Sequence, residues 1–341
     1  MHITEGIITG GQAVMYTGAG LALVGCSVWR MKKFVRDFPD KKPLLGMGGA
    51  LIFFISLIPI PAFTGTTSHP CGTPLIGILL GPLIGFGLTG VSLLLQAAFF
   101  AHGGFGTWGA NVVALGFFGC FFGWLAFRLA RMIGLPIWAA GFAGGLIGDI
   151  MVYVASGLIL GTTLAQAPNP QYSLAGYLIA IYSAYVPTQL PIAIGEMVVT
   201  GLALQYAYRQ RPEVLQELGI IKTKPISKKN SSINVLLAMA FTGLLLFPGP
   251  IADAVDEKQI STESDLRTSN TQATQLGKFA GMDEAVNEKL AEAAGRPARD
   301  PYINTESMGD LWSFLMLAAG GVCGFIVGRW WHLLWGNRRK E

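Results

Sequence analysis

Residues 136–165 read PIWAAGFAGGLIGDIMVYVASGLILGTTLA and contain a single charged side chain, that of Asp149. An α-helix needs about 20 predominantly apolar residues to cross the hydrocarbon core of a bilayer. The stretch is longer than this, and its glycines and alanines would let neighbouring helices approach closely, as they do in membrane proteins. It therefore predicts a transmembrane helix packed among other helices.

The same composition recurs along most of the chain. Hydrophobic residues make up 52% of the 341 residues and charged residues only 13%, whereas soluble domains carry roughly 25% charged residues. Further apolar runs occupy residues 8–29, 44–61, 74–101, 108–127, 173–207, 233–251 and 311–335. We therefore predict an all-α, polytopic transmembrane helical bundle that crosses the bilayer about nine times.

The run at 173–207 is too long for one span and contains Pro187 and Pro191. Proline removes a backbone hydrogen bond and breaks or kinks a helix. We predict two spans here, the first of them short, and about seven spans before Tyr208.

Basic residues cluster in three short segments beside these runs, namely 30–42, 209–229 and 338–340. Because Lys and Arg concentrate in cytoplasmic loops, these segments should face the cytoplasm. Met1 is then outside the cell, and an odd number of spans separates it from residue 209. The same assignment puts the loop of His102 inside and Arg128 and Arg131 outside, and the two arginines conflict with the charge rule.

The C-terminal third has a different composition. Of the 20 acidic residues, 12 lie between Asp253 and Asp310. We predict that residues 252–310 are extracytoplasmic, that 283–294 form a short helix, and that the C-terminus is cytoplasmic. The chain would then comprise residues 1–220, a transmembrane domain of about seven helices, and residues 233–341, two further helices joined by this acidic segment.

Motifs for several kinds of catalysis are absent from the sequence. It has no Walker A loop, HExxH, CxxC or GxSxG, so nucleotide hydrolysis by this chain is not expected and no catalytic residue is assigned. Asp149 and Glu196 are the ionisable residues that clearly lie within spans. Such residues usually face the interior of a bundle, where they line a pathway or serve packing alone.

The N-terminus carries a possible metal chelate. A free amine on Met1, the amide nitrogen of His2 and the His2 ring would close five- and six-membered rings on a metal ion. His69 lies in the loop 62–73, which the topology places on the same side, and would supply a fourth nitrogen. Tetragonal nitrogen sites suit Ni²⁺ and Cu²⁺. The alternative is that His69 is an ordinary loop residue. His332, beside Trp330, Trp331 and Trp335, is typical of an interfacial anchor.

Several motifs now resemble a known family. They are Met1-His2-Ile3 with Gly6, GTTSHPCG at 65–72, ILLGP at 78–82, LLLQAAFFAHGG at 93–104, GAN at 109–111, PIAIGEMVVT at 191–200 and RQRPEVL at 209–215. Together they resemble the CbiM/NikM family, the cobalt/nickel substrate-specificity subunits of energy-coupling-factor (ECF) transporters, a class of ABC transporter. The resemblance covers residues 1–220, and 233–341 resemble the small CbiN/NikN subunit, so the chain is similar to a fusion of the two.

The resemblance implies a function and a ligand set. It implies a bundle of the specificity-subunit type in a bacterial or archaeal cytoplasmic membrane, with metal ligands at Met1, His2 and His69. Ni²⁺ or Co²⁺ would be the transported substrate, with no organic cofactor. Separate ATPase subunits and a coupling transmembrane subunit would hydrolyse ATP and drive transport, so this chain is not expected to be an enzyme. Pro70 and Cys71 depart from the family's usual loop, and Cys71 places a sulfur near the site.

The sequence is also compatible with two other functions. A specificity subunit for a vitamin-like organic ligand would need an aromatic-walled pocket and would not use His2. A membrane enzyme or enzyme-assembly subunit would instead use Asp149 or Glu196. Metal bound to the purified protein separates these alternatives from metal transport.

Overall fold

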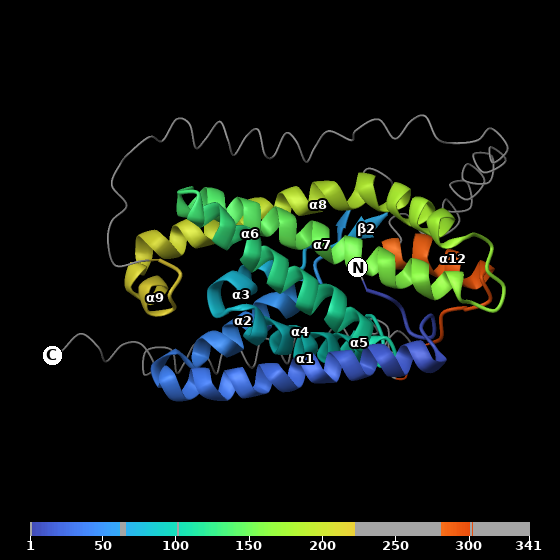
Figure 1. Ribbon diagram of the computed structural model, residues 1–341, viewed down its shortest axis with the longest axis horizontal. Coiled ribbons are helices and arrows are strands. Elements are labelled where there is room, and N and C mark those ends of the chain that lie inside the picture. Colours follow the sequence, from blue (N-terminus) through green and yellow to red (C-terminus); the bar gives the residue numbers. More distant parts are fainter. Residues whose placement is uncertain (1, 62–65, 101, 222–280, 301, 303–341) are drawn as a thin grey trace, which may run out of the picture.

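The computed structural model describes residues 2–61, 66–100, 102–221, 281–300 and 302. These residues form a bundle of long helices with one two-stranded antiparallel sheet, Ile60–Pro61 (β1) and Thr67–Ser68 (β2) (Figure 1). The prediction of an all-α membrane bundle is therefore confirmed. The predicted spans at 233–251 and 311–335, and most of the acidic segment, lie outside the described residues.

Five helical stretches in the described part of the chain are long and apolar enough to cross a bilayer. They are α1 (Gly10–Asp37), α4 (Pro82–Phe99), the continuous stretch Trp108–Met132, α7 (Ile137–Ala165) and α8 (Leu174–Gln210). The stretch at Trp108–Met132 combines α5 (Trp108–Asn111), the π-helical η2 (Val112–Gly119) and α6 (Cys120–Met132). Two shorter apolar helices, α2 (Pro43–Ile55) and α3 (Thr73–Leu80), complete the bundle.

Helix α8 contradicts the prediction of two spans at 173–207. It runs unbroken for 37 residues with Pro187 and Pro191 inside it. Prolines are tolerated within membrane helices because neighbouring helices and polar side chains satisfy the freed backbone groups. Packing against α7 is close: a Cβ atom on Gly145 of α7 would lie 2.8 Å from the Glu196 carbonyl oxygen of α8.

The run at 74–101 also differs from the prediction, because it forms two helices instead of one. Helix α3 ends at Leu80 and α4 begins at Pro82, with Gly81 between them at a φ of 88°. Glycine adopts this left-handed backbone without steric cost, and proline is favoured at the first position of the helix that follows. The chain therefore reverses at Gly81, and the loops between Gly81 and α8 lie at the end opposite to the one predicted. Because α8 is one span where two were predicted, the residues that follow it return to the predicted end.

This reversal brings Arg128 to the same end of the bundle as Arg30 and Lys41, and we call it the basic end. A cavity of about 360 Å³ there is lined by Arg30, Gly81, Arg128 and Glu217, among other residues. Glu217, in the short helix α9 (Pro212–Glu217), also pairs with Lys41 of the 3₁₀ turn η1 (Pro39–Lys41). Arg128 thus lies with the predicted cytoplasmic clusters, and its conflict with the charge rule disappears.

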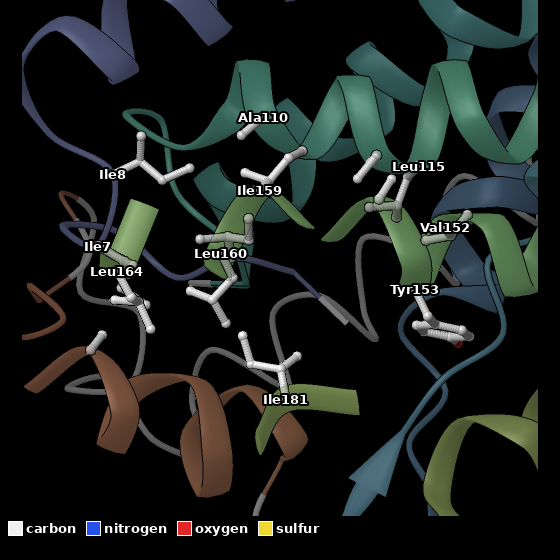
Figure 2. Close-up of a cluster of buried hydrophobic side chains, with 14 of the residues drawn as sticks. Ile7, Ile8, Ala110, Leu115, Val152, Tyr153, Ile159, Leu160, Leu164 and Ile181 are labelled. Carbon is white, nitrogen blue, oxygen red and sulfur yellow. The ribbon is translucent and has the colours of Figure 1, made fainter. Parts of the chain in front are cut away.

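The opposite end holds two segments far apart in the chain. Residues 2–8 turn back from the start of α1 into the molecule, and residues 281–299 pack over them (Figure 1). As predicted, 283–294 are largely helical, as η4 (Asp283–Glu288) and α12 (Lys289–Ala293). Figure 2 shows Ile7 and Ile8 beside Leu160 and Leu164 of α7, in a core that also includes Ala291. Each buried isoleucine contributes about 1.5–3 kcal/mol, so their burial favours the docked position of the N-terminal segment.

Candidate metal centre

The N-terminal segment carries His2 into the interior. Ile3, the next residue, is held by Asn111 of α5, whose Oδ1 accepts the Ile3 N–H at 2.8 Å and whose Nδ2 donates to the Ile3 carbonyl at 3.1 Å. Thr107 Oγ1 donates to the same carbonyl at 2.7 Å. With both peptide groups of Ile3 paired, the position of His2 is fixed, and its side chain is only 1% exposed.

The loop at 66–72, here called the His69 loop, brings the second histidine to the same place. Its first residues pair in the small sheet, where Thr67 lies opposite Pro61 and Ser68 opposite Ile60. Tyr153 of α7 donates its hydroxyl to the His69 carbonyl at 3.4 Å. His69 is 6% exposed, so the loop presents its imidazole to the interior and not to solvent.

His102 completes the group and was placed wrongly by the sequence. It follows α4 in a turn where its backbone N–H donates to Gln96 O at 3.3 Å and Gly103 adopts a φ of 82°. The prediction put His102 at the end opposite His2 and His69, because it treated 74–101 as one span. The turn at Gly81 adds a crossing and returns His102 to their side.

The three imidazoles form a compact cluster. One ring nitrogen from each of His2, His69 and His102 lies within 4.8 Å of those of the other two. The ring centroid of His2 lies 5.1 Å from that of His69 and 4.3 Å from that of His102. His69 Nε2 and His102 Nε2 are 3.3 Å apart. Imidazole is a preferred ligand of Co²⁺, Ni²⁺, Cu²⁺ and Zn²⁺, so this cluster has the chemistry of a transition-metal site.

Hydrogen bonding prepares His69 as a ligand. Its Nδ1 lies 3.1 Å from the Pro70 carbonyl oxygen, which can only accept, so Nδ1 carries the proton. In the neutral ring Nε2 then bears the lone pair, and a carbonyl partner of this kind typically fixes the tautomer of metal-binding histidines. Neither ring nitrogen of His2 has a hydrogen-bond partner among the described residues, although both are buried. A metal ion would satisfy one of them.

Electrostatics keep two of the rings neutral. Burial lowers the pKa of His2 and of His69 well below the ordinary value for histidine, and the neighbouring His102 lowers both further. A neutral imidazole is the form that binds metals. The cluster is therefore poised to accept a cation without first losing protons from these two rings.

The other residues identified in the sequence analysis lie near this cluster or outside the residues that the structure describes. Cys71 is buried, and its thiol is not in the group of ligand atoms that lie within 4.8 Å of one another. Burial, and after it the Asp149 carboxyl, raise the pKa of that thiol. Asp149 and Glu196 are buried on α7 and α8 and interact with each other. Met1 and His332 lie outside the described residues, so the Met1 amine remains a predicted ligand.

The sequence did contain a signal for His102. The dipeptide Gly81-Pro82 interrupts an apolar run longer than one span requires, and Gly-Pro pairs commonly mark turns. A prediction that divided residues 74–101 at this dipeptide would have put His102 on the same side of the membrane as His2 and His69. It would also have put Arg128 at the basic end.

Comparisons with known proteins agree with this geometry. A family model described as "Cobalt uptake substrate-specific transmembrane region" matches residues 2–214. A cobalt transport protein CbiM of Geobacter sulfurreducens is 36% identical over 99% of this chain and 91% of its own length. Another from Sorangium cellulosum is also 36% identical, over 66% of this chain and 99% of its own.

Solved structures lead to the same group. A crystal structure of a transition metal transporter superposes with a TM-score of 0.53 at 27% identity, covering 61% of this chain and 93% of that one. A truncated transition metal transporter gives 0.52, also at 27% identity, and 99% of its chain is covered. The family model spans more than half of the sequence, and the relative from Geobacter matches nearly all of it. The chain is a metal transporter component and belongs to the CbiM family of cobalt uptake substrate-specific transmembrane proteins.

Proposed function

We propose that this chain captures Co²⁺ or Ni²⁺ from outside the cell and delivers it inward as the substrate-specificity subunit of an ECF-type importer. The observation that carries the proposal is the buried cluster of His2, His69 and His102, whose ring nitrogens converge within 4.8 Å. The neutral rings supply nitrogen donors suited to these metals. The names of the relatives from Geobacter and Sorangium favour cobalt as the substrate.

The Met1 amine and the His2 amide complete the proposed ligand set. Together with the His2 ring they would form fused five- and six-membered chelate rings. His69 Nε2 would be the fourth nitrogen of a square-planar ligand set. His102 lies beside His69 and offers a further ring nitrogen. This nitrogen would either bind the metal axially or donate a hydrogen bond. In either arrangement, removing His102 would perturb a site that His2 and His69 still define.

The proposed orientation follows from the two ends of the bundle. The basic end, with Arg30, Arg128 and Lys41, would face the cytoplasm, and the histidine cluster would face outward. The organisms of the relatives support a bacterial or archaeal cytoplasmic membrane. Partner ATPase and coupling subunits would supply the energy, since the chain has no nucleotide-binding motif.

The two-part organisation is also a proposal. The family model ends at residue 214, close to the predicted boundary near residue 220, which supports a metal-binding domain at 1–220. Residues 233–341 would then be the CbiN/NikN-like region. Its segment 281–299 packs against residues 2–8, which supports a role beside the metal site.

The experiment is to measure metal bound to protein purified with an unmodified N-terminus and without chelators. We expect wild-type protein to bind Co²⁺ or Ni²⁺ stoichiometrically and His69→Ala to bind far more weakly, because water is a poorer donor than imidazole for these metals. The matched control is His332→Ala, the histidine that is predicted to be an interfacial anchor. Absence of bound metal in wild-type protein, or equal affinity in His69→Ala, would contradict the proposal.

A further inference from the structure

The His69 loop is attached to α8 at two points. Ser68 Oγ donates to Gln189 Oε1 at 2.9 Å, and the backbone N–H groups of Cys71 and Gly72 both donate to Glu196 Oε2, at 3.1 and 3.2 Å. Gln189 and Glu196 are seven residues apart, about two helical turns, so they lie on one face of α8. His69 lies between the two attachment points in the sequence.

The Glu196 attachment is buried and lies at the start of a helix. The side chain is 1% exposed, and Gly72 is the N-cap residue of α3. N–H groups at the start of a helix have no partner within it, and the helix dipole favours a negative charge there. Both N–H groups donate to the same oxygen, Oε2, so Glu196 holds this side of the loop against α8.

A competing role for Glu196 in an ion pair finds no support. The salt bridges of the described residues are formed by Arg36, Lys41 and Arg211, and none of them involves Glu196. Gly145 of α7 packs closely against the backbone at Glu196, so this turn of α8 has little freedom to move relative to α7.

We infer that Glu196 is a positioning residue of the metal site: its carboxylate fixes the His69 loop against α8 and so sets where His69 Nε2 meets the metal. This inference rests on the proposed function. It assigns a role in capture to a residue that does not itself touch the metal. It also ties the loop to α8, so a displacement of α8 relative to α3 would move His69.

The test compares Glu196→Ala, Glu196→Gln and, as matched control, Glu217→Ala, which removes an exposed carboxylate at the basic end. Each full-length protein is titrated with Co²⁺ against a competing chelator, and the ligand-field spectrum of bound Co²⁺ is recorded. Because two buried hydrogen bonds to the Glu196 side chain are lost, Glu196→Ala should weaken binding by about tenfold or more and shift the bands. Glu217→Ala should match the wild type.

The glutamine variant separates positioning from folding. Its amide oxygen can accept both N–H groups without charge, so its affinity should lie between those of wild type and Glu196→Ala. If Glu196→Ala does not fold, weaker binding and shifted bands in Glu196→Gln support the inference. Wild-type affinity and spectrum in the folded variants, even with a lower melting temperature, would overturn it. Failure of the wild type to bind Co²⁺ would instead refute the proposed function.

Discussion

Replacing Asn111 with alanine tests how far metal binding depends on the docking of the N-terminal segment. Asn111 pairs with both peptide groups of Ile3, and Thr107 Oγ1 shares the carbonyl. In the variant the carbonyl keeps Thr107 as a partner, but the buried N–H of Ile3 keeps none. The Thr107 contact should hold the segment near its native position, so the site weakens but is not lost.

The magnitude follows from the unsatisfied N–H. Leaving a buried donor without a partner costs about 1–3 kcal/mol, which corresponds to about a 5- to 150-fold change in an equilibrium constant. The docked state of residues 2–8 is destabilised by this amount relative to the undocked state. Metal binding requires the docked state, so the apparent affinity should fall by up to the same factor.

The assay is a competitive titration of Co²⁺ and Ni²⁺ into detergent-purified protein. Asn169→Ala is the matched control, because it makes the same change at an exposed position near the same end. Asn169→Ala should bind like wild type. Wild-type affinity in Asn111→Ala would show that metal binding does not depend on this pair of hydrogen bonds.

Three further changes test the site and its orientation. Inserting one alanine between Met1 and His2 should abolish metal binding without unfolding, because the chelate rings change size; unchanged affinity would exclude the terminal chelate. His102→Ala should weaken Co²⁺ binding less than His69→Ala does, and an unaltered Co²⁺ spectrum would remove His102 from the site. With Cys26 and Cys323 replaced by serine, Gln171→Cys should react with an impermeant thiol reagent in intact cells and Glu213→Cys should not; the reverse pattern would invert the proposed topology.

The fold class and part of the site were predictable from the sequence, because both depend on local signals. Apolar length alone predicted α1 and α7, and the chemistry of a terminal amine next to His2 suggested a chelate. The structure brings His2 and His69 together across a large sequence separation. Whether they bind metal together with the Met1 amine stays a prediction.

The sequence did not predict the features of the fold and the site that depend on packing between distant segments. Pro187 and Pro191 do not divide α8, because the neighbouring helices and polar groups of a membrane bundle compensate for the lost hydrogen bonds. The pairing of Glu196 with the His69 loop has no sequence signal at all, since its partners are backbone N–H groups more than 120 residues away. The turn at Gly81, by contrast, has a sequence signal in the dipeptide Gly81-Pro82.

The covering of residues 2–8 has a consequence for how the protein is made. Arg296 Nη1 donates to the Ile7 carbonyl across 289 residues of sequence, and the backbone N–H of Arg299 donates to the Glu5 carbonyl. Residues 2–8 therefore acquire their final contacts only after residues 296–299 have been synthesised. Contacts of such high sequence separation form slowly, because the intervening chain must first be ordered. Until then residues 2–8 consequently lack part of their cover, and they become enclosed only after this late segment has docked.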